Sequence, residues 1–141
     1  MQTDWGLGDL AQEVTSGEEP VLLYRRGAHE IHWVGAEQES VLRCNTYLLR
    51  DGEENILIDP GGRAQFAQTL ERVSRLCPAQ QVTGMVISHQ DPDTAASMVD
   101  WLAINPTIQV FTHPRIHLLL PHYGVKGYAL FPAEQGSQYK L

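Results

Sequence analysis

The stretch SHQDPD, residues 88–93, follows the apolar segment Val82–Ile87 and decides how the rest of the sequence is interpreted. In an extended segment, alternate side chains point to the same side, so His89, Asp91 and Asp93 are expected to converge. Two partly buried carboxylates so close together repel each other, and a bound cation removes that cost. The pattern therefore predicts a metal site. The alternative is a solvated Asp-Pro-Asp turn that only caps the following helix.

The composition is that of one ordinary domain. The chain has 141 residues, 43% of them hydrophobic, and a net charge of -7, which argues against binding nucleic acid or anionic membrane through a basic surface. No apolar run approaches the roughly 18 residues of a membrane span, and the N-terminus lacks the features of a signal peptide. We therefore expect a single cytoplasmic domain over residues 1–141, in which residues 1–20 form a loosely structured arm.

The two cysteines indicate no zinc site. Cys44 and Cys77 are far apart and neither has a Cys-x-x-Cys or Cys/His spacing. We expect two buried, reduced thiols that pack as small apolar residues.

Strand-like and helix-like segments occur in a definite order. The segments with the composition or alternation of strands are Val21–Tyr24, Glu30–Val34, Val41–Leu49, Ile56–Asp59, Val82–Ile87, Ile108–Thr112, Tyr128–Phe131 and Tyr139–Leu141. Apolar residues at helical spacing predict helices over Arg63–Leu76, Thr94–Ile104 and a stretch that begins at Pro114. Several strands followed by strand–helix alternation predict an α/β fold, a mixed sheet with flanking helices.

A second motif lies at the end of an earlier strand. Ile56–Asp59 leads into the break Pro60-Gly61-Gly62. Taken alone, Asp59 is explained as a residue that stabilises the turn. Two strand ends that both carry acidic residues, however, can build one site at an edge of the sheet.

The combination of motifs resembles the metallo-β-lactamase superfamily. That family has an Asn-x-Tyr-Leu strand, found here at residues 45–48, and a Leu-Ile-Asp-x-Gly turn, found here at residues 57–61. Its signature is a strand that ends in Ser/Thr-His-x-(His/Glu/Asp)-x-Asp, which matches residues 88–93. The three motifs occur in family order and cover roughly residues 30–113. The resemblance implies the first half of the αββα sandwich.

The details of the motif are similar to the flavodiiron and oxygen-binding di-iron branch. This chain has Asp91 and Thr94 where hydrolytic members usually have histidines. The segments at residues 31–35 and 121–124 also look like that branch. Carboxylate-rich sites suit iron, whereas histidine-rich sites suit zinc. Non-haem iron is therefore the expected metal, a di-iron pair in the complete domain, with zinc as the alternative.

The resemblance assigns a role to each motif residue. His89 and Asp91 would bind the first metal and Asp93 the second. Asp59 would orient His89 or its loop through hydrogen bonds. Thr94 cannot replace a histidine ligand and would leave an open position for O2. A further residue, His122, would line the pocket.

The family fold consists of two similar halves, and the second half supplies further ligands. No histidine follows His122, and the chain ends at Leu141. We therefore expect a truncated domain with weak or single-metal occupancy. Half a sandwich leaves one sheet face exposed, which favours a homodimer. In the parent protein, a C-terminal signalling domain would follow.

Three functions remain open at this point. The first is a non-haem di-iron domain that binds or senses O2, with O2 or another small molecule as its ligand. The second is a metal-dependent hydrolase of the same superfamily, in which the metal activates a water. The third is a metal-free scaffold or interaction module. The sequence does not decide whether the protein is an enzyme, and it favours O2 binding or redox chemistry over hydrolysis.

Overall fold

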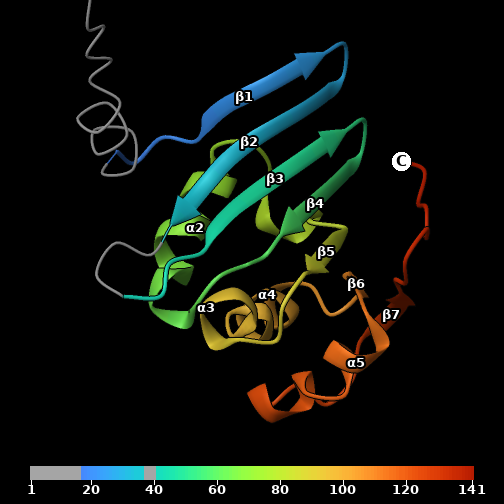
Figure 1. Ribbon diagram of the computed structural model, residues 1–141. Coiled ribbons are helices and arrows are strands. Elements are labelled where there is room, and N and C mark those ends of the chain that lie inside the picture. The colour runs from blue at the N-terminus through green and yellow to red at the C-terminus, as the bar shows by residue number, and fades with distance from the viewer. Residues whose placement is uncertain (1–16, 37–40) are drawn as a thin grey trace, which may run out of the picture.

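Seven strands form one mixed sheet in the computed structural model, which describes residues 17–36 and 41–141 (Figure 1). In chain order the strands are β1 Val21–Arg26, β2 His29–Ala36, β3 Asn45–Asp51, β4 Glu54–Ile58, β5 Gly84–Ile87, β6 Gln109–Thr112 and β7 Ala129–Pro132. The strand order across the sheet is the same as the order along the chain.

The sheet changes direction at β4. Strands β1 to β4 form an antiparallel meander, and β4 to β7 are parallel neighbours. Two hairpin turns contain Gly27 and Gly52 at positive φ, 61° and 58°, a conformation that glycine adopts without steric cost. The parallel strands are joined by helical crossovers, as parallel pairing requires.

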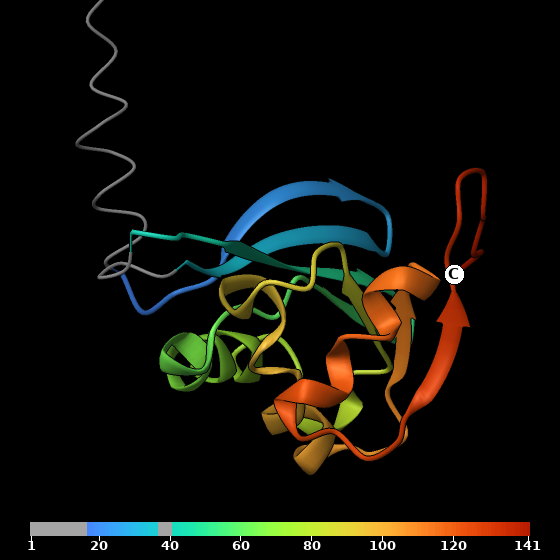
Figure 2. The same cartoon turned by 60° about the horizontal axis from the view of Figure 1, so that its bottom comes forward.

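The helices lie on one face of the sheet, as Figure 2 shows for α2, α3 and α4. They are η1 Arg63–Gln65, α2 Phe66–Ser74, η2 Ala79–Gln81, α3 Pro92–Ala95, α4 Met98–Ile104, α5 Pro114–His117 and η3 Leu120–Tyr123. This arrangement confirms the α/β fold, a mixed sheet with flanking helices.

The main core fills the space between the sheet and these helices. Leu57 of β4 and Met85 of β5 are fully buried there, together with Trp101 of α4. The ring of Phe66 packs edge-on against Trp101, with 5.5 Å between the ring centroids. Alternate residues of β4 and β5 point away from this core, as the strand period requires.

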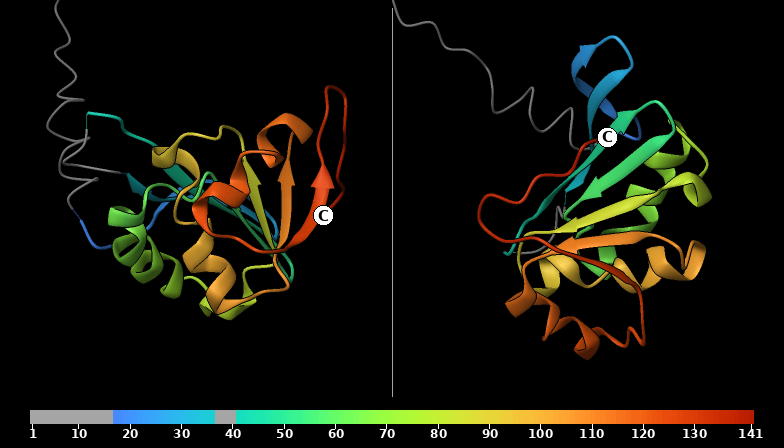
Figure 3. Two further views of the ribbon diagram at one scale, coloured as in Figure 1. Left: turned by 90° about the horizontal axis from the view of Figure 1, so that it is seen from below. Right: turned by 90° about the vertical axis from the view of Figure 1, so that its right-hand side faces the viewer.

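The opposite face of the sheet is covered in part by the C-terminal segment, which turns back along the sheet after β7 (Figure 3). The ring of Tyr139 lies 4.7 Å from that of Phe111 and 5.8 Å from that of Phe131, centroid to centroid. Tyr139 and Leu141 line a shallow apolar hollow with Ile58 and other strand residues. The expected strand over Tyr139–Leu141 is therefore wrong. This segment makes ring contacts with the sheet face instead of pairing with an edge strand.

The expected helix over Thr94–Ile104 is also wrong in detail, because the chain forms two short helices, α3 and α4. The backbone N–H of Ser97 donates to the carbonyl oxygen of Gly61 at 3.0 Å, outside the helix. This bond ties the junction of the two helices to the turn after β4. The strand expected from Val41 begins only at Asn45.

Most of the expected N-terminal arm, residues 1–16, lies outside the described residues. Its last part, residues 17–20, is described and contacts α2. Arg72 donates from Nη2 to the carbonyl oxygen of Gly17 at 2.6 Å, and Arg75 pairs with Glu19. This end of the arm is thus docked on a helix.

Candidate metal centre

The candidate site lies where the parallel strands end. Asp59 follows β4 and His89 follows β5, and the carboxyl ends of parallel neighbours meet at the same edge of a sheet. Because β3 runs antiparallel to β4, its beginning lies at this edge too. Thr46, near the start of β3, therefore reaches the turn after β4.

Asp59 has a left-handed backbone conformation, with φ at 52°. Non-glycine residues adopt it rarely and at a cost, so surrounding contacts must hold it. Its N–H donates to the carbonyl oxygen of Val86 at 2.9 Å, and its own carbonyl oxygen accepts from the Thr46 hydroxyl at 2.7 Å. Its carboxylate accepts from the N–H of Ser88 at 2.8 Å and from the Ser88 hydroxyl at 2.6 Å. Asp59 thus anchors the residue directly before His89.

The turn that follows Asp59 anchors the other end of the motif. The N–H of Gly61 donates to the carbonyl oxygen of Thr94 at 2.9 Å. The hydroxyl of Ser97 donates to the carbonyl oxygen of Pro60, also at 2.9 Å. Gly61 has φ at 89°, and an added Cβ would lie 2.8 Å from Nε2 of Gln65. Glycine is therefore required at this position, and residues 88–93 are fixed on both sides.

Two of the three expected ligands lie together. Nδ1 of His89 is 3.2 Å from a carboxylate oxygen of Asp91, and both side chains are about half exposed. The N–H of Asp91 donates to the same Nδ1 at 3.3 Å. Asp93 lies in the first turn of α3. Pro92 begins a helix there, so the three residues do not share one extended segment. Within residues 17–36 and 41–141, no three His, Cys, Asp or Glu side chains are grouped so as to hold a metal ion.

Helix capping does not explain the Asp91 carboxylate or the buried oxygen of Asp93. Asp91 occupies the N-cap position of α3, but its side chain makes no capping hydrogen bond within the described residues. Its backbone carbonyl oxygen instead accepts from Thr94 and Ala95, both at 3.0 Å. One oxygen of Asp93, Oδ1, is buried without a hydrogen-bond partner in the described part of the chain. Such an atom is costly unless something else binds it.

Two weakly acidic side chains, Cys44 and Tyr123, lie near the carboxylates at this edge of the sheet. Burial raises the pKa of the Cys44 thiol to about 11, and Asp59 and Asp93 add to that effect. Burial also raises the pKa of Tyr123, with Asp91 and Asp93 as further causes. In both cases the nearby carboxylates disfavour another negative charge. The same carboxylates favour a cation.

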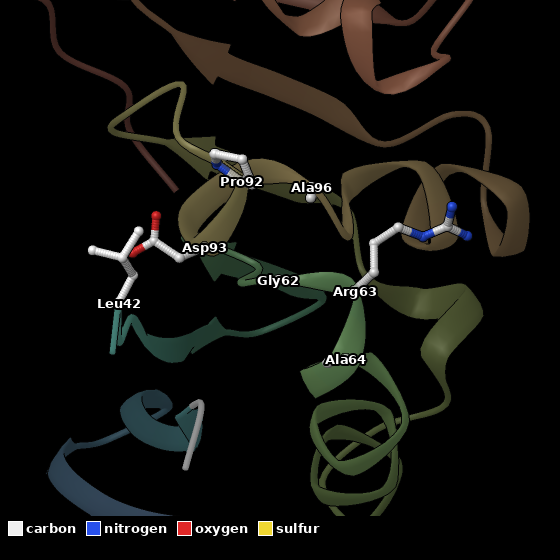
Figure 4. Close-up of a pocket in the computed structure, with 7 residues that line it drawn as sticks. All are labelled: Leu42, Gly62, Arg63, Ala64, Pro92, Asp93 and Ala96. Atoms are coloured by element: carbon white, nitrogen blue, oxygen red, sulfur yellow. The ribbon is translucent and has the colours of Figure 1, made fainter. Parts of the chain in front are cut away.

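A cavity of about 330 Å³ opens beside Asp93, and Figure 4 shows the residues that line it. The side chains of Leu42 and Asp93 lie on one side, whereas the guanidinium of Arg63 extends away from them. Arg63 is held by Asp100, with Nη2 to Oδ1 at 2.8 Å and Nε to Oδ2 at 3.2 Å. The Asp93 carboxylate therefore borders a space large enough for a small ligand.

The structure places the remaining predicted residues around this edge. Thr94 is buried in α3. His122 is exposed in η3. Its neighbour Tyr123 donates a hydrogen bond from its hydroxyl to the carbonyl oxygen of Gln90, inside the motif. The segment that contains His122 thus contacts the motif loop through Tyr123.

Four residues that fix the site were missed from the sequence: Thr46, Gln65, Ser97 and Tyr123. A signal existed for Gln65, because it lies on the buried side of an amphipathic helix, where an amide needs a reason. Thr46 belongs to the Asn-x-Tyr motif, but the motif alone does not reveal its partner. Tyr123 contacts Gln90 from 33 residues away, a pairing that only the fold brings about.

Solved structures with this fold include proteins with di-iron centres. The chain is similar to a structure described as a peroxy diiron species of the chemotaxis sensor ODP, at 25% identity and a TM-score of 0.65, over 81% of this chain and 45% of that one. It also resembles the flavodiiron protein of Giardia intestinalis, at 18% identity and a TM-score of 0.69, over 84% and 31%. The chain thus spans less than half the length of these relatives.

The same fold occurs in a metallo-β-lactamase mutant of Cronobacter sakazakii, which matches at 18% identity and a TM-score of 0.66, over 79% of this chain and 46% of that one. No functionally curated protein matches the sequence significantly. No helix in the described part of the chain is both long and apolar enough to cross a bilayer.

A family model described as "ODP family beta lactamase" matches residues 42–141. These residues include the turn after β4, the motif at residues 88–93 and every parallel strand of the sheet. The resemblance seen in the sequence is thereby confirmed, and the chain belongs to the ODP family of the metallo-β-lactamase superfamily.

Proposed function

We propose that this chain supplies the first-half ligands of a non-haem di-iron centre that binds O2, as part of an oxygen sensor. His89, Asp91 and Asp93 are the ligands in this proposal. The observation that carries it is the pair of motif carboxylates: Asp91 makes no capping hydrogen bond, and Asp93 has a buried oxygen without a partner in the described residues. Membership of the ODP family and the likeness to the di-iron sensor support the choice of iron and of O2.

The donor set suits iron. One imidazole and two carboxylates give a site rich in oxygen donors, which suits iron. Zinc sites are typically richer in sulfur or histidine donors. Nε2 of His89 makes no hydrogen bond within the described ranges, 17–36 and 41–141, and is thus available as a donor atom. When bound, iron supplies the redox chemistry and the open coordination position that O2 binding needs.

The residues around the ligands would hold them before metal arrives. Asp59 fixes Ser88, and the Gly61 turn fixes Thr94, so the loop between them has little freedom. Tyr123 covers the loop from the other side through Gln90. The second metal would depend on Asp93 alone among these three, so we propose weak or single occupancy unless another chain or further residues complete the centre.

Iron loading of the protein tests the proposal. The chain, stripped with chelator, is mixed with Fe(II) under anaerobic conditions, and thermal unfolding and iron content are measured. We expect bound iron and a raised midpoint, because a ligand that binds only the folded state stabilises it. After exposure to air, a visible absorption band should appear. A protein that takes up no iron and whose midpoint does not change would contradict the proposal and leave a metal-free scaffold.

A variant pair makes the test specific. Asp91→Asn with Asp93→Asn should abolish the iron-dependent rise in midpoint, while the iron-free protein is as stable as wild type or more so, since like charges are removed. The control is Glu53→Gln with Glu134→Gln, which removes the same charge from two exposed positions outside residues 88–93. Equal loss of iron binding in both pairs would mean that net charge alone attracts the metal.

Hydrolysis is the competing activity for the same residues. The likeness to the Cronobacter metallo-β-lactamase is at 18% identity and shows the fold alone. Thr94 occupies a position where hydrolytic members of the superfamily have a histidine. A zinc-loaded protein that hydrolyses a β-lactam or an ester, with turnover lost in the Asp91/Asp93 pair, would favour the hydrolase instead.

A further inference from the structure

A buried amide and a buried hydroxyl connect helix η1, directly before α2, to the strained turn at Asp59. Gln65 is 2% exposed and Thr46 is fully buried. Nε2 of Gln65 donates to Oγ1 of Thr46 at 3.1 Å, and that hydroxyl donates to the carbonyl oxygen of Asp59 at 2.7 Å. The two bonds form a continuous chain from the helix to the one non-glycine residue of positive φ in the described part of the protein.

Gln65 also contacts the turn by packing. The position of a Cβ on Gly61 would be 2.8 to 3.0 Å from the three terminal atoms of the Gln65 side chain. The amide thus lies directly over the Gly61 backbone. It holds the turn from one side, while the N–H of Gly61 is held by Thr94 from the other.

Stability alone does not account for Gln65. Its Oε1 is buried and makes no hydrogen bond within the described residues. An unsatisfied buried carbonyl destabilises the folded state, and an apolar side chain of the same shape would avoid that cost. The hydrogen bond from Nε2 of Gln65 to Thr46 is the simpler explanation for an amide at this buried position.

We propose that Gln65 and Thr46 are positioning residues for the candidate metal centre. They hold Asp59 in its left-handed conformation, and Asp59 in turn holds Ser88 next to His89. This inference rests on the proposed function for its metal part. Its structural part, the dependence of Ser88 on Gln65 and Thr46, stands without a metal.

The expected sign of each effect distinguishes positioning from packing. Gln65→Met keeps the volume and loses the hydrogen bond, so the metal site should loosen while the thermal midpoint stays close to that of wild type. Thr46→Val keeps the shape and loses the hydroxyl, whereas Thr46→Ser keeps the hydroxyl. A matched control is Thr69→Val, because Thr69 is fully buried one helical turn after Gln65, and its hydroxyl has no partner in the described residues.

Co(II) alone serves as the metal probe, because its visible absorption reports both affinity and ligand geometry. Losing a residue that orients a ligand typically weakens metal binding about 10-fold or more. We expect such a loss and a changed spectrum for Gln65→Met and Thr46→Val, recovery in Thr46→Ser, and wild-type behaviour in Thr69→Val. Wild-type affinity and spectrum in both Gln65→Met and Thr46→Val would overturn the proposal.

Hydrogen exchange of the Ser88 amide, measured on the metal-free protein, separates the two proposals. This amide donates to Asp59 and should exchange faster in Gln65→Met and Thr46→Val, with core amides such as that of Met85 unchanged. If wild type fails to bind Co(II), the metal centre is refuted, and the exchange rates still decide the positioning role. Unchanged exchange at Ser88 would refute that role even if metal binds.

Discussion

The carboxylate of Asp59 binds Ser88 through both oxygens, one to the backbone N–H at 2.8 Å and the other to the hydroxyl at 2.6 Å. The bond spans 29 residues of sequence and joins the ends of two neighbouring parallel strands. It places a residue of strained backbone conformation directly beside the first candidate ligand. The stability of this contact can be measured without any metal.

Replacing Asp59 should destabilise the fold in a graded way. Asp59→Ala removes both bonds and puts alanine at φ 52°, so we expect a loss of roughly 2 kcal/mol in the free energy of unfolding. Asp59→Asn should cost less, since asparagine tolerates positive φ and keeps one acceptor oxygen. Urea unfolding measures both, and an Asp59→Ala protein as stable as Asp59→Asn would contradict the account.

The two adjacent glycines of the turn should respond differently to alanine. Gly61→Ala combines φ at 89° with a Cβ 2.8 Å from Gln65, and we expect a loss of about 1–3 kcal/mol. Gly62→Ala is the matched control, because φ there is -74° and the nearest atom to a Cβ lies at 3.6 Å. Urea unfolding of the pair tests the prediction, which fails if the two variants are equally stable.

The reactivity of Cys44 should require alkaline pH. Burial, with Asp59 as the next cause, raises the pKa of this thiol from 9.0 to about 11. Since the thiolate is the nucleophile, alkylation by iodoacetamide should keep accelerating up to about pH 11 in a Cys77→Ala background. The same protein in urea should reach its plateau near pH 9. A folded-state plateau near pH 9 would contradict the prediction.

The same shift determines the direction of a stability change. Below the unfolded pKa of 9.0 the Cys44 thiol is protonated in both states and contributes no pH dependence. Between that value and about 11, the unfolded thiol ionises while the folded one stays protonated, so stability falls as pH rises. Cys44→Ser should reduce this fall, measured by urea unfolding at pH 8 and pH 10.

The C-terminal segment should limit association through the second face of the sheet. Tyr139 covers Phe111 and Phe131, so Tyr139→Ser uncovers aromatic surface, and we expect a larger dimer fraction by light scattering at micromolar concentration. Lys140→Ser, on the adjacent and exposed residue, is the control. A Tyr139→Ser protein that remains a folded monomer would refute both this role and the homodimer expected from the sequence.

Much of the fold follows from local patterns. The strand-forming composition of β2 to β4, the glycines at hairpin turns and the amphipathic period of α2 all appear in the sequence. The break between α3 and α4 does not, because it comes with a hydrogen bond from Ser97 to Gly61, 36 residues earlier. Tyrosine is common in strands, but the ring of Tyr139 packs against Phe111 on the face of the sheet instead.

The site was predictable in its residues and not in its geometry. The spacing of His89, Asp91 and Asp93 indicates metal chemistry, but it does not show that Pro92 begins a helix that contains Asp93. Pro92 was itself the available signal, because proline is favoured at the first helical position. The hydrogen bond of Gln65 could not be predicted, since its partner Thr46 is 19 residues away and on another element.

The hydrogen bonds that frame the motif have a consequence for how the protein folds. They join residues 13 to 37 positions apart, from Thr46 to Asp59 up to Pro60 to Ser97, and do not involve β1 or β7. The entropy cost of closing a loop grows only slowly with its length, so loops of this size close without needing the rest of the chain. The frame of the candidate centre can therefore assemble while the chain is still being synthesised, before the last strand of the sheet has emerged from the ribosome.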